Sequence, residues 1–400
     1  MPAPEADDAL PASPVTLEPV HTAKDRAAFM DVADILHRSD PSWIAPLRFE
    51  MDERLQASKN PALEGVDHAL WVARQEGRLV GRISAQINPR HLERHGDNAA
   101  HFGFFAAADA PGVSEALLAA AENWARERGM TRLAGPFNFT INQECGLLVD
   151  GFDTPPALMM GHDLPRYERQ LTQAGYTPAK DLIAYRFSLT NDAVPPRLQK
   201  LVKRLASDPS VQMRSLNVSA YRQEVETIMD IFNDAWSENW GFIPFAPPEI
   251  AHMATELRPL VKPDWLSIAE WNGEPVAFAL ALPNLPEATR DLGGRLLPFG
   301  WAKLLYRLKV AGLKSIRMPL MGVRKRLQGS TVGAGLSFAV IDAVYQACRA
   351  RGVVTSELSW ILDNNRNMKR LIEEIGGEPY KTYRLFEKPL GGETSAADAA

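Results

Sequence analysis

The chain has 400 residues, of which 46% are hydrophobic and 23% charged, and this predicts a globular protein of about two domains. Its formal net charge of -5 provides no global basic field and argues against a nucleic-acid partner. Two cysteines, Cys145 and Cys348, are too few for a disulfide framework or a cysteine-rich zinc site. We therefore expect no metal and a reducing compartment, the cytoplasm.

Neither end of the chain predicts a membrane anchor. Residues 1–14 have no basic start followed by an apolar run, and no stretch approaches the roughly 18 uninterrupted apolar residues of a spanning helix. We expect residues 1–14 and 391–400 to be disordered, because both are rich in small and polar residues. Any contact with a membrane is then peripheral.

Strand and helix signals alternate in the first half of the chain. Apolar alternation on either side of a Glu76-Gly77 turn predicts a pair of strands, and Gly129 and Gly175 end two segments of helical spacing. In chain order we expect strands at 69–74, 79–88 and 101–107, a helix at 113–128, a helix at 164–174 and a strand at 183–189.

The second half follows a similar order. The elements that we expect are a helix at 221–236, strands at 265–271 and 276–282 around an Asn272-Gly273 turn, a strand at 317–323, a helix at 332–351, a strand at 354–358, a helix at 366–375 and a strand at 381–387. The repeat favours duplication over two unrelated α/β units. Prolines between 191 and 209 predict a linker that separates domains at 15–190 and 210–390.

The most informative motif is a basic, glycine-containing loop between a strand and a long helix. Arg324, Lys325 and Arg326 come shortly before Gly329-Ser330-Thr331-Val332-Gly333-Ala334-Gly335. Glycine lets a backbone approach a ligand closely, and the amides and dipole of a helix N-terminus attract phosphate oxygens. The motif therefore predicts a pyrophosphate site, and a glycine loop without a ligand is the alternative.

From Arg317 to Leu390 the chain resembles the GNAT superfamily of acyl-CoA N-acyltransferases. The resemblance is clear over 211–389 and looser over 15–189, and it implies an α/β mixed-sheet fold of two tandem GNAT-like domains. It also implies that the loop and helix hold coenzyme A pyrophosphate, while a strand at 354–358 splays from its neighbour to admit the pantetheine arm. The implied coenzyme-binding residues are Met321, Gly322, Val323, Arg326, Gln328, Gly329, Ser330, Thr331, Val332, Gly333, Ala334, Gly335 and Asn365.

The chain departs from the family pattern at three places. Ser330 stands where the family usually has Arg or Gln, and Ile372 stands where it often has a catalytic tyrosine, so Tyr383 becomes a candidate acid. In the first half, the acidic segment 108–112 stands where the basic loop should be. We therefore expect the domain at 15–190 to bind no coenzyme.

Acylation of an amine needs a base for the ammonium proton and donors for the thioester oxyanion. Segment 135–146 places many polar side chains among Phe and Pro, and it offers Glu144 as the first candidate base, with His162 as the second. The alternative is that Glu144 and nearby asparagines only satisfy backbone groups of a loop. Cys145 has no obvious activating neighbour and is better explained as a small buried thiol.

The family resemblance places the acceptor beside the first helices of the domain, at 232–242. Trp236 and Trp240 are one helical turn apart and can share a face, while Glu238 and Asn142 offer polar contacts to an amine. The alternatives are core packing for the two tryptophans and an ordinary surface acid for Glu238.

A long insert at 283–315 replaces the short hairpin that the family usually has. In its core, 295–314, apolar and aromatic residues alternate with cations and acids are absent, which is typical of a helix lying in a membrane interface. Packing on its own domain is the alternative. In size, two-domain layout and insert the chain resembles the bacterial ceramide synthases, which implies a fatty acyl-CoA and a sphingoid base as substrates.

Four functions are compatible with these features. The first is a long-chain N-acyltransferase that works at the inner face of the membrane. The others are a soluble acetyltransferase for a small amine or peptide, a non-enzymatic acyl-CoA-binding protein, and a relative of the Fem-type aminoacyl transferases. The modest acidic charge argues against the last, which would have to bind tRNA.

Overall fold

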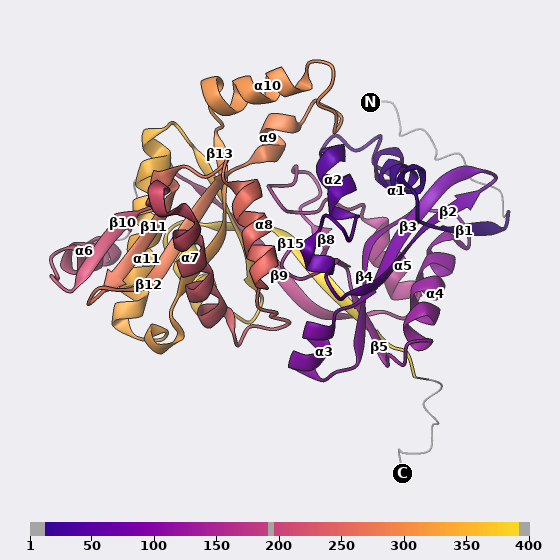
Figure 1. The fold of residues 1–400 in the computed structure, drawn as a ribbon, viewed down its shortest axis with the longest axis horizontal. Helices are drawn as coiled ribbons and strands as arrows, with labels where there is room; N and C mark the ends of the chain where they lie inside the picture. The colour runs from indigo at the N-terminus through magenta and orange to yellow at the C-terminus, as the bar shows by residue number, and fades with distance from the viewer. Residues whose placement is uncertain (1–12, 191–195, 392–400) are drawn as a thin grey trace, which may run out of the picture.

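A computed structural model describes residues 13–190 and 196–391. The two ends that we expected to be disordered lie almost entirely outside the described residues. In the described part, thirteen strands form one continuous mixed sheet, and two further short strands form a separate ribbon (Figure 1).

The N-terminal half contains the elements that its alternation predicts, most of them within a few residues of the expected bounds. With those that were not predicted, the helices and strands of this half are β1 (Val15–Pro19), α1 (Ala23–Leu36), α2 (Arg48–Arg54), β2 (Asp67–Gln75), β3 (Arg78–Ile87), α3 (Pro89–His95), β4 (Ala99–Ala107), α4 (Val113–Arg126), β5 (Arg132–Gly135), β6 (Phe137–Asn138), β7 (Glu144–Cys145), β8 (Leu147–Asp150), α5 (Arg166–Gln173) and β9 (Thr177–Ser188).

The C-terminal half repeats this order with longer helices. It contains α6 (Pro196–Ala206), β10 (Val211–Ser215), α7 (Tyr221–Trp236), α8 (Pro247–Leu257), β11 (Leu266–Trp271), β12 (Glu274–Pro283), α9 (Leu285–Thr289), α10 (Gly300–Tyr306), β13 (Ser315–Val323), α11 (Thr331–Ala350), β14 (Thr355–Leu362), α12 (Arg366–Glu374) and β15 (Glu378–Pro389). Helix α6 lies inside the segment 191–209 that we expected to be a linker.

The sheet order shows the internal repeat directly. Strands β1 to β5 lie side by side, antiparallel except for the parallel pair β4–β5, and strands β10 to β14 repeat this pattern with the parallel pair β13–β14. The two sets run inward from opposite edges of the sheet. The same fold is therefore built twice along the chain, as the order of its elements predicted.

The last strand of each half is exchanged with the other half. β9 pairs with β14 of the C-terminal half, and β15 lies between β5 and β9 (Figure 1, yellow strand entering the indigo half). Both strands bond along most of their length, so the two halves share one backbone hydrogen-bond network. A boundary near residue 200 divides the sequence but does not divide the sheet.

Alternating residues of β12 show how helices cover both faces of the sheet. Ala277, Ala279 and Ala281 pack in one apolar cluster with α11, while Phe278 and Leu280 pack in another with α7. This period of two is what a strand buried on both faces requires. Of the described helices, α11 alone has the length and apolarity to cross a membrane, but 56% of its apolar window is buried in this protein.

Candidate active site

The parallel strands β13 and β14 part half-way along their length. They pair from Ser315–Thr355 to Met318–Leu358, and beyond this point β14 keeps only its antiparallel partner β9. A cavity of about 120 Å³ lies where the strands diverge. Its walls come from β13, β14, α7, α8 and the N-terminal segment around β7, and most of the lining is apolar: Ile141, Cys145, Met159, Leu182, Phe232, Trp236, Trp240, Phe242, Phe245, Met253, Leu257, Leu282, Pro319, Leu320, Trp360 and Leu362.

Arg317 is the charged residue in this lining. Its side chain is buried, donates to the carbonyl oxygens of Leu158 and Ser359, and lies over the Trp360 ring at 4.9 Å. Burial lowers the pKa of Arg317. Its Nε has no partner among the described residues, so a buried cation with an unused donor lies at the cavity.

The predicted basic loop follows β13 and leads into the N-terminus of α11. Within the described chain, the amides of Thr331 and Val332 have no protein acceptor, while the amide of Gly333 is bonded to the Ser330 hydroxyl at 3.0 Å. Ser330 therefore acts as the N-cap and satisfies one of the first four amides. Two amides of the first turn therefore remain unpaired in the described chain and are available to an anion.

The two glycines of this turn have different structural reasons. A Cβ at Gly333 would fall 2.0 Å from the Leu327 carbonyl oxygen, so only glycine fits the closed loop. A Cβ at Gly335 would fall 2.5 Å from the Leu205 side chain, and this glycine instead permits close packing of α6 on α11. Gly335 thus serves packing between helices, away from the two unpaired amides.

The basic residues of the loop are paired with acids on the surface. Arg324 bonds Asp230, Lys325 bonds Glu238, and Arg326 bonds Glu274. Exposed pairs of this kind contribute about 0–1 kcal/mol each, so a pyrophosphate can compete for the cations.

Other expected coenzyme residues already make contacts within the protein. Gln328 donates from its amide to the carbonyl oxygens of Ala235 and Val323, which ties the loop to α7 and β13. Met321 accepts at its carbonyl from the Trp236 indole at 2.9 Å. Asn365 caps α12 by accepting from the Met368 amide at 3.1 Å, so its side chain already has a local role.

The equivalent gap in the N-terminal half is filled by the chain itself. Strands β4 and β5 pair only from Ala99–Arg132 to His101–Ala134, and β6 then enters the space between them. The Asn138 side chain accepts from the Phe104 amide at 2.6 Å, and a Cβ at Gly103 would fall 2.0 Å from the Phe137 carbonyl oxygen. Helix α4 also begins without a side-chain cap after the acidic loop, where Arg166 and Gln170 occupy the carbonyls of Ala107 and Ala108.

We call residues 137–145, which include β6 and β7, the plug of the N-terminal half. Glu144, the first candidate base, lies in this plug and not in the lining of the cavity. Its carboxylate is 2.9 Å from Arg54 and accepts from the Asn138 amide at 2.9 Å. Burial alone would raise the pKa of Glu144, but these partners outweigh it and hold the pKa below its usual range. Its neighbour Cys145 faces the cavity, but burial raises the pKa of that thiol to about 12, as expected of an inert buried cysteine. The geometry does not support proton acceptance by Glu144.

The other two catalytic candidates also lie outside the cavity lining. His162 is bonded to Asp40 at 2.8 Å in the N-terminal half, and burial lowers its pKa. Tyr383 on β15 is fully buried and donates to the Gly161 carbonyl at 3.0 Å; burial raises its pKa well above the usual value. Its ring packs on Trp360, which lines the cavity, so Tyr383 supports a lining residue without lining the cavity itself.

A buried acid near the cavity was missed by the sequence reasoning. Glu357 on β14 lies directly opposite Arg317 in the parallel pair and accepts from the Tyr380 hydroxyl. Burial raises the pKa of Glu357 to about 7, and its Oε1 has no hydrogen-bond partner in the described structure. Ser359, two residues further along the same strand, lines the cavity. The sequence did contain a signal for this pair, because Arg317 and Glu357 each interrupt an otherwise apolar strand pattern, and charged residues are rarely buried without a partner.

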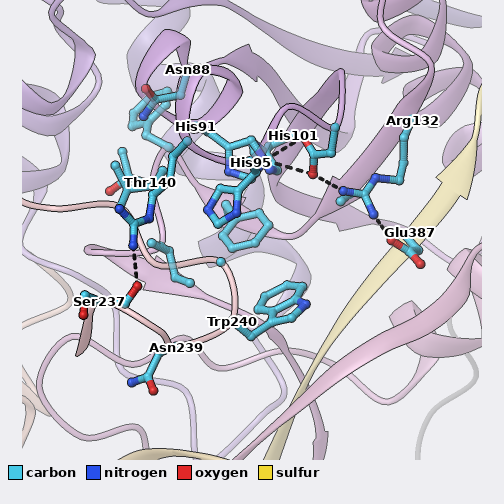
Figure 2. A pocket seen from close by; sticks show the side chains of 18 of the residues that line it. Asn88, His91, His95, His101, Arg132, Thr140, Ser237, Asn239, Trp240 and Glu387 are labelled. Atoms are coloured by element: carbon cyan, nitrogen blue, oxygen red, sulfur yellow. Dashed lines mark hydrogen bonds and ion pairs between the residues drawn. The ribbon is translucent and has the colours of Figure 1, made fainter. Parts of the chain in front are cut away.

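Three of the four predicted acceptor-site residues do line the cavity: Asn142, Trp236 and Trp240. Glu238 does not: it pairs with Lys325 and lines another cavity. Trp240 also borders a second, larger cavity of about 600 Å³ between α3 and the segment after α7. Figure 2 shows this cavity with His91 and His95 on one side and Ser237, Asn239 and Trp240 on the other.

Comparison with known proteins identifies two relatives that match nearly the whole chain. The chain is 43% identical over 366 residues to Protein YghO of Escherichia coli strain K12, covering 92% of this chain and 93% of that protein. It is 44% identical over 375 residues to the bacterial ceramide synthase of Caulobacter vibrioides strain NA1000 / CB15N, covering 93% and 97%. The model of the Acetyltransferase (GNAT) family matches residues 31–138. The chain belongs to the GNAT family.

Solved structures of GNAT proteins confirm the fold. The tandem GNAT protein from the clavulanic acid biosynthesis pathway aligns with a TM-score of 0.56 at 14% identity, covering 95% of this chain and 100% of that one. A GNAT protein from Sphaerobacter thermophilus aligns with a TM-score of 0.51 at 16% identity, covering 95% and 97%. The family match at 31–138 lies in the N-terminal half, and the tandem GNAT structure aligns with 95% of the chain, so the predicted fold of two tandem GNAT-like units is confirmed. The prediction of an acyl-CoA-dependent N-acyltransferase is confirmed.

Proposed function

We propose that this enzyme binds acyl-CoA in its C-terminal half, with the pyrophosphate at the N-terminus of α11 and the pantetheine arm between β13 and β14. The observation that carries the proposal is the contrast between the halves. The gap between β13 and β14 contains a cavity, whereas β6 occupies the gap between β4 and β5. In addition, two amides at the start of α11 have no acceptor in the described chain, and three basic side chains lie just before them.

We propose further that the acyl group is long and that the acceptor is a sphingoid base, which gives a ceramide. One of the two relatives reported above is named a bacterial ceramide synthase. The cavity is lined mainly by apolar side chains from α7, α8, β13 and β14, which suits a hydrocarbon chain. No cluster of three or more metal-ligating side chains occurs among the described residues, and the proposed reaction requires none.

The residues around the cavity suggest how the reaction proceeds. The amine nitrogen attacks the thioester carbonyl carbon, an oxyanion forms, and the C–S bond then breaks to release coenzyme A as the thiolate. Arg317, with its unpaired Nε at the cavity, stabilises the oxyanion. The Ser359 hydroxyl lines the cavity and donates to the Met160 sulfur at 3.4 Å in the free protein; turned toward the unpaired Oε1 of Glu357, it relays the amine proton to that carboxylate. The Glu357 pKa of about 7 suits a base at neutral pH.

The insert supplies a surface suited to a lipid interface. In Figure 1, α10 stands away from the sheet, with the π-helical turn Arg307–Ala311 following it. Leu297 is 80% exposed, Phe299 79% and Val310 71%, and the aromatic rings of Trp301 and Tyr306 are also exposed. The nearby cations Arg295, Lys303, Lys309 and Lys314 can bind anionic headgroups at about 1 kcal/mol each, although Lys303 is paired with Asp291 in the free protein. We propose that this surface docks the enzyme on the inner face of the membrane.

Chain length and acceptor are tested together by measuring coenzyme A release. Palmitoyl-CoA and acetyl-CoA are each offered with sphinganine and with a small water-soluble amine. The proposal predicts fastest turnover for palmitoyl-CoA with sphinganine, and that pair alone should be stimulated by vesicles containing phosphatidylglycerol. Replacing Phe299 by Asp should remove the stimulation and leave turnover of detergent-dispersed substrate unchanged. Preference for acetyl-CoA and the small amine would contradict the lipid assignment.

A short-chain acetyltransferase remains the second candidate, and the size of the cavity favours it. A cavity of about 150 Å³ holds one benzene molecule, so the cavity of about 120 Å³ in the free protein receives only the first few carbons of an acyl chain. To bind a long acyl chain, either α8 must move away from the cavity or the end of the acyl chain must extend out of the cavity along α8. The same chain-length assay separates the two candidates.

A further inference from the structure

The segment between α7 and α8, residues 237–246, has no helix or strand structure. It nevertheless carries Trp240, Phe242 and Phe245, which line the smaller cavity. Carbonyl groups outside helices and sheets need other donors when they are shielded from water. Four carbonyls of this segment obtain donors from side chains of the N-terminal half, as described next.

Helix α3 supplies three of these donors. Arg94 donates to the Ser237 carbonyl, His95 contacts the Phe242 carbonyl through Nε2 at 3.2 Å, and Arg90 donates to the Pro244 carbonyl at 3.2 Å. Arg90 also pairs with Glu249 at 2.6 Å, at the start of α8. One short helix therefore holds the segment near both of its ends.

The plug of the N-terminal half supplies the remaining contacts. Asn142 donates to the Ile243 carbonyl at 3.0 Å, and the Ile141 side chain lies 3.0 Å from the position that a Cβ would take at Gly241. Phe137 stacks against Trp240, with ring centroids 6.4 Å apart. The N-terminal half thus supports residues 237–246, which form part of the wall around the cavity in the C-terminal half.

This wall separates the two cavities. Ile141, Asn239 and Trp240 line both the apolar cavity of about 120 Å³ and the cavity of about 600 Å³. The larger cavity is lined by polar groups, among them Asn88, whose Nδ2 is buried without a partner in the described structure. An amine with a polar headgroup is better accommodated there than in the apolar cavity.

We propose that the N-terminal half, through α3, acts as a positioning element that fixes residues 237–246, and that Trp240 on this segment determines which acceptors pass from the larger cavity to the thioester. The inference rests on the proposed acyl-CoA site in the C-terminal half. Arg94 and His95 also line the larger cavity, but they position residues 237–246 through their contacts with the Ser237 and Phe242 carbonyls, and neither lines the cavity proposed for acyl-CoA.

The test uses Arg94→Ala with His95→Ala in the full chain, and Glu93→Ala as the matched control. Glu93 is exposed on the same helix and makes no hydrogen bond or ion pair in the described structure. Amide hydrogen exchange over 237–246 should accelerate about tenfold in the double variant and stay unchanged in the control. The KM for sphinganine should rise about tenfold, while the KM for palmitoyl-CoA stays within about twofold.

Trp240→Ala leaves every α3 hydrogen bond in place and tests the wall itself. It should accept amines with bulkier headgroups than the wild type does, and Trp240→Phe should not. Unchanged exchange over 237–246 in the double variant, or equal rises in both KM values, would overturn the inference. If the wild type turns over neither substrate while exchange accelerates as expected, the proposed function fails and the positioning role stands.

Discussion

Replacing Glu144 by Gln separates a structural role from a catalytic one. The Arg54–Glu144 pair is short, at 2.9 Å, and the two side chains are 16% and 20% exposed. Removing one partner of a fully buried pair costs about 3–5 kcal/mol. Because both groups retain some contact with water and Gln still accepts from Asn138, we expect about 2–3 kcal/mol. Turnover at saturating substrate should stay within about twofold of the wild type.

The loss is measured by urea unfolding followed by tryptophan fluorescence. The pKa of Glu144 is lowered in the folded protein, so its stabilising contribution is present above the unfolded value of 4.5 and disappears as the pH falls through the folded value. The difference between wild type and variant should therefore shrink below about pH 4.5. Glu53→Gln, which breaks an exposed pair with Lys59, is the control and should change stability by less than about 1 kcal/mol. Wild-type stability combined with a hundredfold loss of turnover would refute the reasoning and restore Glu144 as the base.

Four further substitutions test the site. Glu357→Gln should lower turnover at least about a hundredfold. In the wild type, turnover should rise with pH through about 7, while the stability contributed by the raised pKa of this carboxyl is fully present below pH 4.5 and is lost as the pH rises through about 7. The variant should show neither change. Gly333→Ala should abolish the thermal stabilisation by coenzyme A, since its Cβ would meet the Leu327 carbonyl at 2.0 Å. Lys325→Ala should raise the KM for acyl-CoA several-fold at low salt. Glu238→Ala removes the ion-pair partner of Lys325 and should lower the same KM. Equal KM values in these two variants would argue against a contact between Lys325 and a phosphate.

Local signals in the sequence predicted much of the fold. The Asn272-Gly273 turn, with φ of 53° and 80°, placed the β11–β12 hairpin correctly. The basic loop before α11 was predicted in the same way, because backbone requirements at a helix start are set by the residues present there. Helix α6, within the proline-marked segment, was missed since two neighbouring prolines suggested a linker and one of them instead begins the helix.

The sequence could not show that the catalytic candidates lie outside the lining of the smaller cavity. Glu144 was singled out from its neighbours in sequence, but its partner Arg54 lies ninety residues earlier, and no local pattern shows that pairing. Likewise, β15 brings Tyr380 to Glu357 only because it crosses into the middle of the shared sheet. The exchange of the last strands depends on long-range pairing, which periodicity along one segment does not encode.

The central claim is that the coenzyme lies between β13 and β14. A crystal structure with a thioether analogue of palmitoyl-CoA tests it most directly. We expect the pyrophosphate to accept hydrogen bonds from the Thr331 and Val332 amides, with Asn138 still bonded to the Phe104 amide in the other half. A coenzyme found at the start of α4, with Asn138 displaced from between β4 and β5, would contradict the account.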